Sequence, residues 1–269
     1  MKKIIALIIV TVSFVQCSTV PITGRKRLNM VKDSQVLPAS FSQYEGFLKE
    51  NKLSKDMTKT AQIKRVGNRI SEAVNKFMKA NGMQKEAEAY KWEFNLVEDE
   101  TVNAWCLPGG KVVFYTGIMP ICANEDGVAA VMGHEVAHAF AKHGQERMST
   151  GRLQQIGGVA LALGTRNSEN AALWNAAYGI GSQVGIMLPF SRTHETEADK
   201  LGLVFMLMAG YKGEEAAEVW VRMSQRSGKS SQPEFMSTHP SNQSRIRTLR
   251  AYLPEAKKLA AKYNTSPKK

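Results

Sequence analysis

A histidine–glutamate–histidine pattern in the middle of the chain has the residue types and the spacing of a metal-dependent hydrolase. Residues 134–138 read His-Glu-Val-Ala-His, the HExxH pattern. On a helix, residues four apart lie on one face, so His134 and His138 could bind one Zn²⁺. Glu135 lies about 100° around the helix, where it could take a proton from a water whose pKa the metal lowers to about 7. We therefore predict His134 and His138 as metal ligands and Glu135 as the general base.

The flanking residues argue against the alternative, which is that HExxH has arisen by chance in an ordinary helix. Residues 131–133, 136–137 and 139–140 are uncharged, and this predicts a buried helix. Buried histidines and a buried glutamate need polar partners, because an unpaired polar group is costly away from water. A bound metal ion would supply those partners.

A catalytic zinc site also needs a third protein ligand and an open position for substrate or water. A metzincin would have a third histidine six residues after His138, but that position is Gly144. His143 is off the ligand face, and we interpret it as a cation at the C-terminal end of the helix. The third ligand must therefore come from another element.

An acidic cluster downstream provides a candidate. Residues 194–199 read His-Glu-Thr-Glu-Ala-Asp and begin a second helical pattern. Glu195 and Asp199 are four residues apart and share a face. This suits Glu195 as the third ligand and Asp199 as the hydrogen-bond partner that fixes the tautomer of a ligand histidine. We interpret Glu197 as a surface carboxylate and assign His194 no role in the site.

A loop near the C-terminus contains another candidate, His239, in the sequence Ser-Thr-His-Pro at residues 237–240. His239 could donate a hydrogen bond to the oxyanion of the tetrahedral intermediate, with Arg245 holding the loop. Alternatively, His239 could occupy the open zinc position in a latent state. The third possibility is an ordinary loop histidine.

The elements that must position these residues are mostly helical. Asn124 can cap the HExxH helix, which we expect over 124–142, and its first turn is acidic. Residues 90–117 alternate like strands around a turn at 108–110. Further helical patterns cover 34–82, 193–209, 213–226 and 241–262. We predict an α+β fold, largely helical and zincin-like, with a small β-sheet and one catalytic domain over 34–262.

Residues 151–190 are unusual because they are rich in Gly and Ala and contain few charges. Two apolar stretches, 156–163 and 171–190, are separated by the polar residues 166–170. We expect buried helices here. The alternatives are a mobile apolar lid that restricts entry to unfolded segments, and a hairpin that faces a membrane.

The N-terminus has the features of an export signal. Residues 1–16 combine a basic start with an apolar run of signal-peptide length. Cys17 follows directly, and we predict that it is lipidated and anchors the chain to a membrane. A cleaved secretory signal and an uncleaved anchor are the alternatives. We expect a linker with a docking strand over 17–33, a flexible tail over 263–269, and a location in a bacterial cell envelope, at the outer membrane.

Composition sets few further limits. The chain has 269 residues, of which 43% are hydrophobic and 22% charged, with a formal net charge of +12. Lys and Arg are scattered and no nucleic-acid-binding motif is visible, so we expect no nucleic-acid partner. Cys106 and Cys122 could form a disulfide in an oxidising compartment or remain buried free thiols.

Together, these motifs make the sequence similar to the zinc metallopeptidases that include HtpX and the CAAX prenyl proteases, and most of all to their exported lipoprotein branch, typified by LoiP and BepA. The resemblance extends from about residue 17 to 250 and rests on these segments: 23–25, 103–105, 107–111, 116–117, 133–138, 195–199, 239–240 and Arg245.

The resemblance implies a gluzincin site with one Zn²⁺ per chain on His134, His138 and Glu195. It also implies that the hairpin with Asn103, Gly109 and Gly110 borders the cleft and that an extended substrate adds there as a strand. The expected function is hydrolysis of internal peptide bonds in misfolded or misassembled exported proteins, with outer-membrane assembly machinery as a candidate partner. The alternatives are a non-proteolytic assembly factor or chaperone with a latent zinc site, and an integral-membrane protease.

Overall fold

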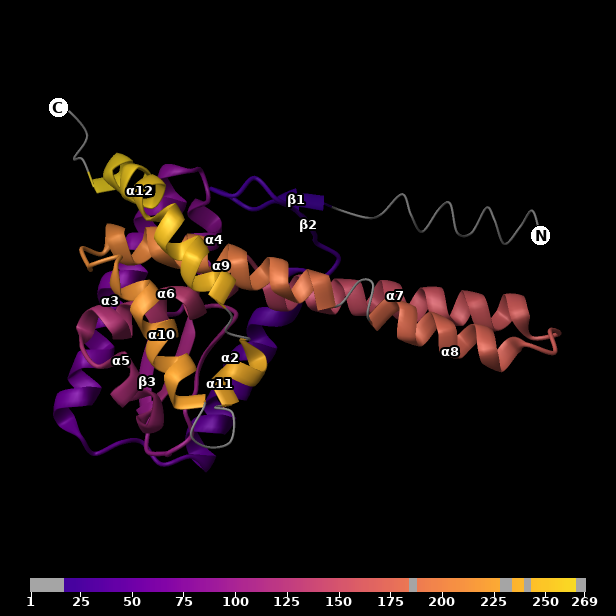
Figure 1. Cartoon of the computed structure of the whole chain (residues 1–269), viewed down its shortest axis with the longest axis horizontal. Coiled ribbons are helices and arrows are strands. Elements are labelled where there is room, and N and C mark those ends of the chain that lie inside the picture. Colours follow the sequence, from indigo (N-terminus) through magenta and orange to yellow (C-terminus); the bar gives the residue numbers. More distant parts are fainter. Residues whose placement is uncertain (1–16, 184–187, 228–233, 240–242, 265–269) are drawn as a thin grey trace. The chain divides into compact units, whose positions relative to one another are not determined.

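The computed structural model describes residues 17–183, 188–227, 234–239 and 243–264 of the chain (Figure 1). The expected signal peptide and the end of the expected tail lie outside these residues. The chain forms two compact units, one from residues 1–36 and 141–194 and the other from residues 37–140 and 195–269. Within the described part, no helix has the length and apolarity that crossing a bilayer requires. The predicted α+β class, mostly helical with small sheets, is confirmed.

The second unit contains a three-stranded sheet in the order β3-β5-β4. β3 (Glu93–Val97) runs parallel to β5 (Lys111–Tyr115), and β4 (Ala104–Leu107) runs antiparallel to β5. The β4–β5 hairpin closes through Gly109 and Gly110, whose φ angles of 86° and 87° are strained for other residues. The hairpin turn predicted at 108–110 is therefore confirmed, and β4 forms an outer edge of this sheet.

Helices surround this sheet, and those expected from periodicity are present. The helices that contain residues of the second unit are α2 (Asp33–Glu50), α3 (Met57–Ala80), α4 (Gln84–Ala89), η1 (Thr116–Ile118), α5 (Met119–Cys122), α6 (Glu125–Phe140), α9 (Leu188–Met208), α10 (Glu215–Ser227), α11 (Glu234–Thr238) and α12 (Gln243–Asn264).

Aromatic packing joins the three central helices of this unit. Phe77 of α3, Phe140 of α6 and Phe205 of α9 are fully buried, and their ring centroids lie 5.1–5.9 Å apart. The rings meet edge to face, an arrangement that aromatic pairs favour beyond simple burial. This cluster fixes α6 and α9, the two helices that carry the candidate ligands.

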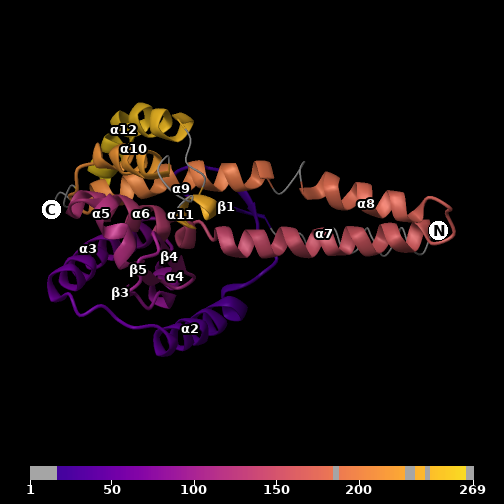
Figure 2. The same ribbon diagram turned by 60° about the horizontal axis from the view of Figure 1, so that its bottom comes forward.

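The first unit consists of a strand pair and a helical hairpin. β1 (Cys17–Thr19) pairs antiparallel with β2 (Lys26–Leu28), and α7 (His143–Thr165) precedes α8 (Ala171–Ser182). Figures 1 and 2 both show α7 and α8 side by side. Cys17 is exposed at the start of β1 and is not joined to another cysteine, and Cys106 and Cys122 are likewise free thiols. Lipidation of Cys17 stays a prediction.

A buried ion cluster holds the strand pair onto the start of α7. Arg25 donates to both carboxylate oxygens of Glu146, at 2.8 and 2.7 Å, and His194 lies 3.0 Å from the same carboxylate. His143 stacks on His194 with ring centroids 4.0 Å apart, and both are fully buried. The expected docking strand is thus present. The interpretation of His143 as a cation at a helix C-terminus is wrong, because this residue is buried and begins the next helix.

The expectation that residues 151–190 form buried helices is also wrong where the structure describes them. Val159 and Leu163 of α7 are 60% and 63% exposed, and Leu173 of α8 is 65% exposed. These helices pack on each other, but each has an outer face that other described residues of this unit do not cover. The lid and the membrane-facing hairpin are the alternatives that remain.

Candidate metal centre

Helix α6 presents the two histidines of HExxH. The Asn124 side chain caps the helix, because its Oδ1 accepts a hydrogen bond of 2.8 Å from the backbone N–H of Gly127. The helical repeat then stacks His134 and His138 on one face, with their Nε2 atoms 3.1 Å apart. Both side chains are buried. Their ligand nitrogens thus converge on one point, as the spacing predicts.

Two glycines bring α9 against α6 at this level. A Cβ on Gly133 would lie 2.8 Å from the carbonyl oxygen of Gly202, and a Cβ on Gly202 would lie 2.7 Å from the Gly133 carbonyl carbon. Any larger residue at either position would push the helices apart. This close approach places Glu195 beside the histidines. Its carboxylate oxygens lie 3.3 Å from Nε2 of His134 and 3.4 Å from Nε2 of His138.

The three side chains have the spacing that zinc requires. Ligand bonds of about 2.0–2.1 Å in a tetrahedral site put neighbouring ligand atoms about 3.3 Å apart. The observed separations among His134, His138 and Glu195 are 3.1, 3.3 and 3.4 Å. Two imidazoles and one carboxylate are also the donor set of the gluzincin class. These residues therefore fit a zinc ion.

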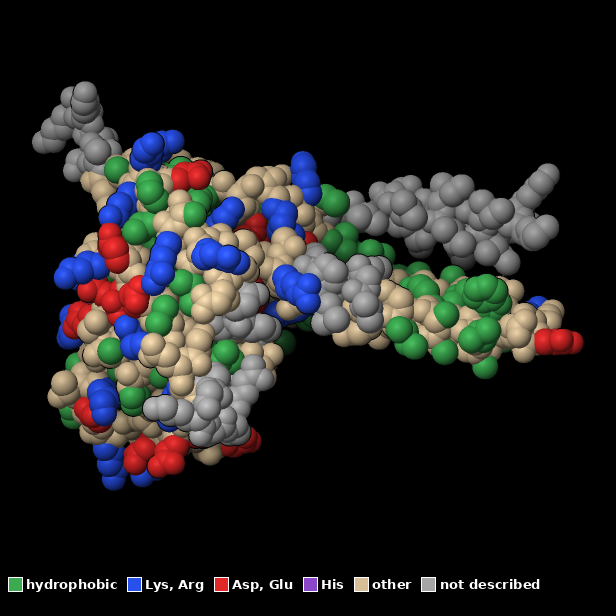
Figure 3. Space-filling model, in the orientation of Figure 1, with side chains coloured by type: hydrophobic (Ala, Val, Ile, Leu, Met, Phe, Trp, Pro, Cys, Tyr) green, Lys and Arg blue, Asp and Glu red, His purple; other side chains and the backbone are tan. Residues whose placement is uncertain are grey.

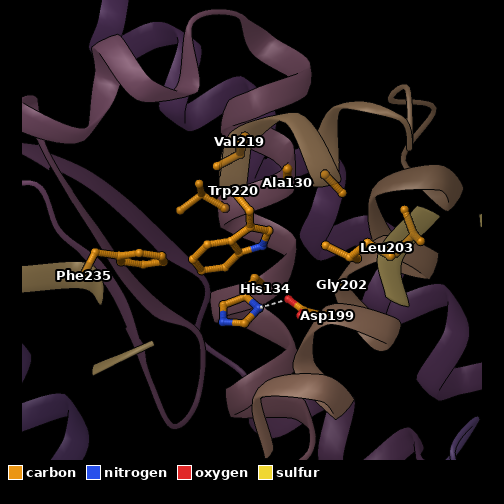
Figure 4. A pocket seen from close by; sticks show the side chains of 11 residues that line it. Ala130, His134, Asp199, Gly202, Leu203, Val219, Trp220 and Phe235 are labelled. Atoms are coloured by element: carbon orange, nitrogen blue, oxygen red, sulfur yellow. Dashed lines mark ion pairs between the residues drawn. The ribbon is translucent and has the colours of Figure 1, made fainter. Parts of the chain in front are cut away.

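Asp199 orients the first histidine. Its Oδ1 lies 3.0 Å from Nδ1 of His134 (Figure 4), whereas the ligand cluster contacts Nε2 of the same ring. This contact keeps the proton on Nδ1 and leaves the Nε2 lone pair for a metal. The structure thus places Asp199 where its spacing from Glu195 predicted.

Arg245 holds the carboxylates of the site. Its guanidinium donates two hydrogen bonds to Asp199, at 2.8 and 2.7 Å, and lies 3.1 Å from Oε2 of Glu195. A longer hydrogen bond of 3.4 Å reaches the backbone carbonyl of His239. Arg245 therefore does more than hold the loop, because it neutralises two buried acidic groups and fixes their positions.

Trp220 and Phe235 are site residues that the sequence analysis missed. The guanidinium carbon of Arg245 lies 3.7 Å from the centroid of Trp220, in a cation–π contact, and Trp220 stacks on Phe235. Figure 4 shows both rings lining a pocket beside His134. An aromatic residue on an amphipathic helix usually packs in the core, so no sequence signal distinguished Trp220 and Phe235 from ordinary core residues.

Glu135 is buried, and few polar groups contact its carboxylate. Its Oε1 accepts no hydrogen bond from the described residues, and Nε2 of His239 lies 3.4 Å away. Burial raises the pKa of Glu135 above its ordinary value, even though His239 and His134 act to lower it. A buried carboxylate with a free oxygen and a raised pKa suits a proton acceptor that works near neutral pH.

The charges around Glu195 favour the ionised carboxylate, which is the form that can bind a metal. Burial alone would raise the pKa of this carboxyl, but hydrogen bonds from His134 and His239 outweigh that effect and hold it far below its ordinary value. Burial would lower the pKa of His134, yet Asp199 and Glu195 raise it to about 9. Without a metal, these groups therefore form a network of ion pairs, and a metal ion must displace the proton on Nε2 of His134 to bind, while the proton on Nδ1 stays with Asp199.

His239 lies within the ligand cluster. Its Nδ1 is 3.2 Å from Nε2 of His134 and 3.0 Å from Oε2 of Glu195. Together with His138, these three side chains form a group of four whose ligand atoms all lie within 4.8 Å of one another. His239 is therefore placed to be a fourth ligand, as in the latent state that the sequence allowed.

Asn103 and the two glycines occupy opposite ends of the β4–β5 hairpin. Asn103 donates a hydrogen bond of 3.0 Å to Glu234, the first residue of α11, which leads to His239. Gly109 and Gly110 form the turn, where an added Cβ would collide with Phe41 or Trp92. The geometry thus gives Asn103 a link to the site and gives the glycines a role in the turn. Contact with a substrate stays a prediction for all three.

The interpretation of Glu197 as a surface carboxylate is wrong. Its side chain is buried, as are those of Glu195 and Asp199 on the same helix. The neighbouring His194 is buried as well and binds Glu146, as described above. Three acidic groups of α9 are therefore inside the protein, and this segment is far more enclosed than its polar sequence suggests.

Removal of the Arg245 guanidinium should be strongly destabilising. Arg245→Met leaves the buried Asp199 carboxylate without its main partner, and we expect the free energy of unfolding to fall by about 3–5 kcal/mol. Urea denaturation of the purified chain measures this change. Arg250→Met on the same helix is the matched control, since the Arg250–Glu218 pair is exposed and should contribute about 1 kcal/mol or less. Equal losses for both variants would contradict the assignment.

Comparison with known proteins decides the family. Residues 61–253 match peptidase family M48. The chain belongs to peptidase family M48. Its relatives are metalloendopeptidases, and the site contains the ligand group of a zinc enzyme, so this chain is an M48 zinc metalloendopeptidase.

Several relatives of the chain are mitochondrial proteins. Mitochondrial metalloendopeptidase OMA1 of Schizosaccharomyces pombe is 34% identical over 249 residues, which are 90% of this chain and 68% of that protein. OMA1 of Saccharomyces cerevisiae is 38% identical over 63% of this chain and 49% of that protein. The beta-barrel assembly-enhancing protease of Escherichia coli is 26% identical over 58% of this chain and 33% of that protein.

These relatives correct the expected location. The prediction of a bacterial outer-membrane lipoprotein is wrong, because relatives that match 90% or more of the chain are named as mitochondrial. The bacterial protease matches over a shorter stretch at lower identity. The chain spans about two thirds of the fission-yeast relative and about half of the budding-yeast relative.

Proposed function

We propose that the chain hydrolyses internal peptide bonds of protein substrates with one zinc ion bound by His134, His138 and Glu195. The observation that carries this proposal is the convergence of three ligand atoms, 3.1–3.4 Å apart, next to the partner-poor carboxylate of Glu135. When bound, zinc acts as a Lewis acid that polarises the substrate carbonyl and acidifies water.

The residues of the chain supply the proton transfers and the orientation. Glu135 accepts a proton from the attacking water and later returns it to the leaving nitrogen. Its raised pKa keeps it a competent acid in the second step as well as a base in the first. Asp199 and Arg245 keep His134 and Glu195 in place while charge develops, because each is itself fixed by hydrogen bonds.

We propose that the substrate binds as an added strand along the outer edge of β4. In the described sheet, β4 pairs on one side only, with β5. An extended peptide could bond to the other side through its backbone, which would make recognition tolerant of sequence. Asn103, at the start of this edge, is linked through Glu234 to the helix that leads to His239. Unfolded segments are the substrate class that such an edge accepts.

The relatives' names favour a mitochondrial location for the whole protein and an endopeptidase activity there. The activity itself is tested by mapping the products of reduced casein with mass spectrometry. We expect new ends inside the casein chain that disappear in the presence of a zinc chelator. Release of single terminal residues alone would contradict endopeptidase action.

The position of His239 favours latency over stabilisation of the oxyanion. Because its Nδ1 lies 3.0–3.2 Å from two ligand side chains, this ring takes the place that water or substrate needs. We expect His239→Ala to raise the turnover of a soluble peptide about threefold to tenfold, in line with a blocking contact worth about 1 kcal/mol. A fluorogenic peptide assay measures the change.

Ser237→Ala is the control for this experiment. Ser237 is an exposed residue of α11, two residues before His239, and its hydroxyl donates to the backbone carbonyl of Glu234 in the same helix. The turnover of this variant should equal that of the unmodified chain. A fall in activity in His239→Ala, with an unchanged Ser237→Ala, would assign His239 to oxyanion stabilisation and contradict latency.

A further inference from the structure

The hairpin of α7 and α8 concentrates the exposed apolar side chains of the chain. Six large apolar residues on it are more than half exposed: Ile156, Val159, Leu163, Leu173, Trp174 and Ile180. In the rest of the described chain, Met57 is the one other large apolar residue with that exposure. Figure 3 shows hydrophobic side chains gathered over this segment. We call residues 153–183 the apolar hairpin.

Charge is confined to the ends of the apolar hairpin. Residues 153–165 and 171–183 contain no Asp, Glu, Lys or Arg. Arg147 and Arg152 are exposed just before the first stretch, and Arg166 and Glu169 are exposed in the turn between the helices. A helix that is apolar on its outer faces is normally covered by protein or by lipid.

The polar groups between the two helices satisfy one another. The Tyr178 hydroxyl donates a hydrogen bond of 3.0 Å to the carbonyl of Gln154 in the other helix. The Gln154 amide donates to Ser182 at 2.6 Å, and Ser182 donates to the Gly179 carbonyl at 3.0 Å. Gly157 allows the close contact, because an added Cβ would lie 2.2 Å from the Tyr178 oxygen. Small residues and hydrogen bonds between helices are typical of helix pairs in membranes.

Two other polar side chains, the half-buried Thr165 and the exposed Asn175, bond back to their own helix. The hydroxyl of Thr165 donates to the Leu161 carbonyl at 2.8 Å, and the amide of Asn175 donates to the Ala171 carbonyl at 2.9 Å. Such bonds satisfy a polar group without a hydrogen bond to water. This is what a hydrocarbon environment demands, because an unsatisfied group costs several kcal/mol there.

From these contacts we infer that the apolar hairpin is buried in the interfacial region of a lipid bilayer that contains anionic lipids. A protein partner would normally find side-chain donors and acceptors across its interface, roughly one hydrogen bond for every 100–200 Å². The apolar hairpin instead bonds most of the polar side chains of its helices internally, and Gln155 and Gln183 are the exposed exceptions. The exposed Arg147 and Arg152 at the start of the apolar hairpin match anionic head groups. The turn at its other end carries one charge of each sign, on Arg166 and Glu169. Of the two alternatives that the sequence left open, a membrane contact and a lid, these features favour the membrane.

The hairpin lies along the membrane surface. At about 1.5 Å per residue, segment 153–165 is about 20 Å long, which is shorter than the roughly 30 Å hydrocarbon core. An upright hairpin would carry Arg166 and Glu169 into the hydrocarbon, where charges are costly. In an orientation parallel to the surface, both charged ends reach the head groups while Trp174 and its apolar neighbours are buried.

Trp174 fluorescence tests this inference on the full chain. The emission of Trp174 is obtained as the difference between the unmodified chain and Trp174→Phe, each mixed with vesicles of equal parts phosphatidylcholine and phosphatidylglycerol. We expect that lipids brominated on the acyl chains quench this difference and that Trp92, Trp105 and Trp220 contribute no quenching. The readout is local, so other membrane contacts of the chain do not affect it. A difference signal that brominated lipids leave unchanged would overturn the inference.

Paired charge substitutions test the same surface by vesicle flotation. Ile156→Glu with Ile180→Glu should reduce quenching of Trp174 and weaken binding to the vesicles at least about tenfold, since two buried apolar contacts are lost. The matched control is Leu53→Glu with Met57→Glu, the exposed apolar residues of the other unit, and it should bind as the unmodified chain does.

Two further measurements test whether the charged variant is folded and whether the chain associates with itself. Cleavage of a soluble peptide should be unchanged in the charged variant, which shows that the chain is folded and separates this inference from the proposed peptidase function. Light scattering without lipid should give the same mass for the charged variant and the unmodified chain. A doubled mass that only the unmodified chain shows would mean that a second copy covers the apolar hairpin, and this would also overturn the inference.

Discussion

Glu135→Gln should reduce the turnover of a fluorogenic peptide by about 10²–10⁴-fold, the range associated with loss of a general base. Glutamine keeps the shape of the side chain but cannot accept the proton from the attacking water. Because Glu135 is adjacent to the ligand cluster and contributes no ligand atom to it, the zinc content and the melting temperature should remain close to those of the unmodified chain. Rate, metal content and melting temperature should be measured on one preparation.

Glu125→Gln is the matched control, because Glu125 is in the first turn of the same helix and pairs with the exposed Arg65. It should leave turnover unchanged. The same Glu135→Gln variant separates a peptidase from a chaperone with a latent zinc site. Full rescue of a deletion strain by Glu135→Gln would favour the chaperone and contradict a role that depends on proteolysis.

Removal of the metal should abolish turnover and lower the melting temperature. The metal-free site retains a buried carboxylate and three histidines whose arrangement zinc would stabilise. A ligand that binds only the folded state at about 1,000 times its dissociation constant adds about 4 kcal/mol of stability. For a chain of this size, each kcal/mol corresponds to roughly 2–4 °C, so adding zinc back should raise the melting temperature by about 10 °C.

His138→Gln provides the control for the zinc titration. This variant keeps a polar side chain of similar size but loses one of the predicted ligands. Zinc should therefore raise its melting temperature far less and should not restore turnover. A rise equal to that of the unmodified chain would place the metal at some other group of residues.

The metal site could be predicted from sequence because its chemistry follows helical spacing. HExxH on a buried helix brings the imidazoles of His134 and His138 together, and the four-residue separation of Glu195 and Asp199 puts both carboxylates on one face. The contact that unites the two helices could not be predicted. It depends on Gly133 and Gly202, whose backbones touch although they are far apart in the sequence. A glycine in a helical pattern does not by itself predict a close contact between helices, because it can also mark a helix end or a functional position.

Other errors have physical causes of the same kind. The helix that contains HExxH ends earlier than expected because Lys142 adopts a left-handed φ of 56°, and a lysine gives no warning of this conformation. His143 therefore begins a new helix and is buried. The apolar stretches of α7 and α8 were assigned to the core because an apolar run has the same sequence pattern whether protein or lipid covers it.

The identity of the zinc ligands is central to the proposed peptidase activity, and metal analysis tests it. Inductively coupled plasma mass spectrometry should find about one zinc per chain in the unmodified protein and much less than that in Glu195→Ala. Asn264→Ala, at the exposed end of α12, should retain the full content. Equal zinc in Glu195→Ala and the unmodified chain would show that α9 contributes no ligand and would contradict the proposed site.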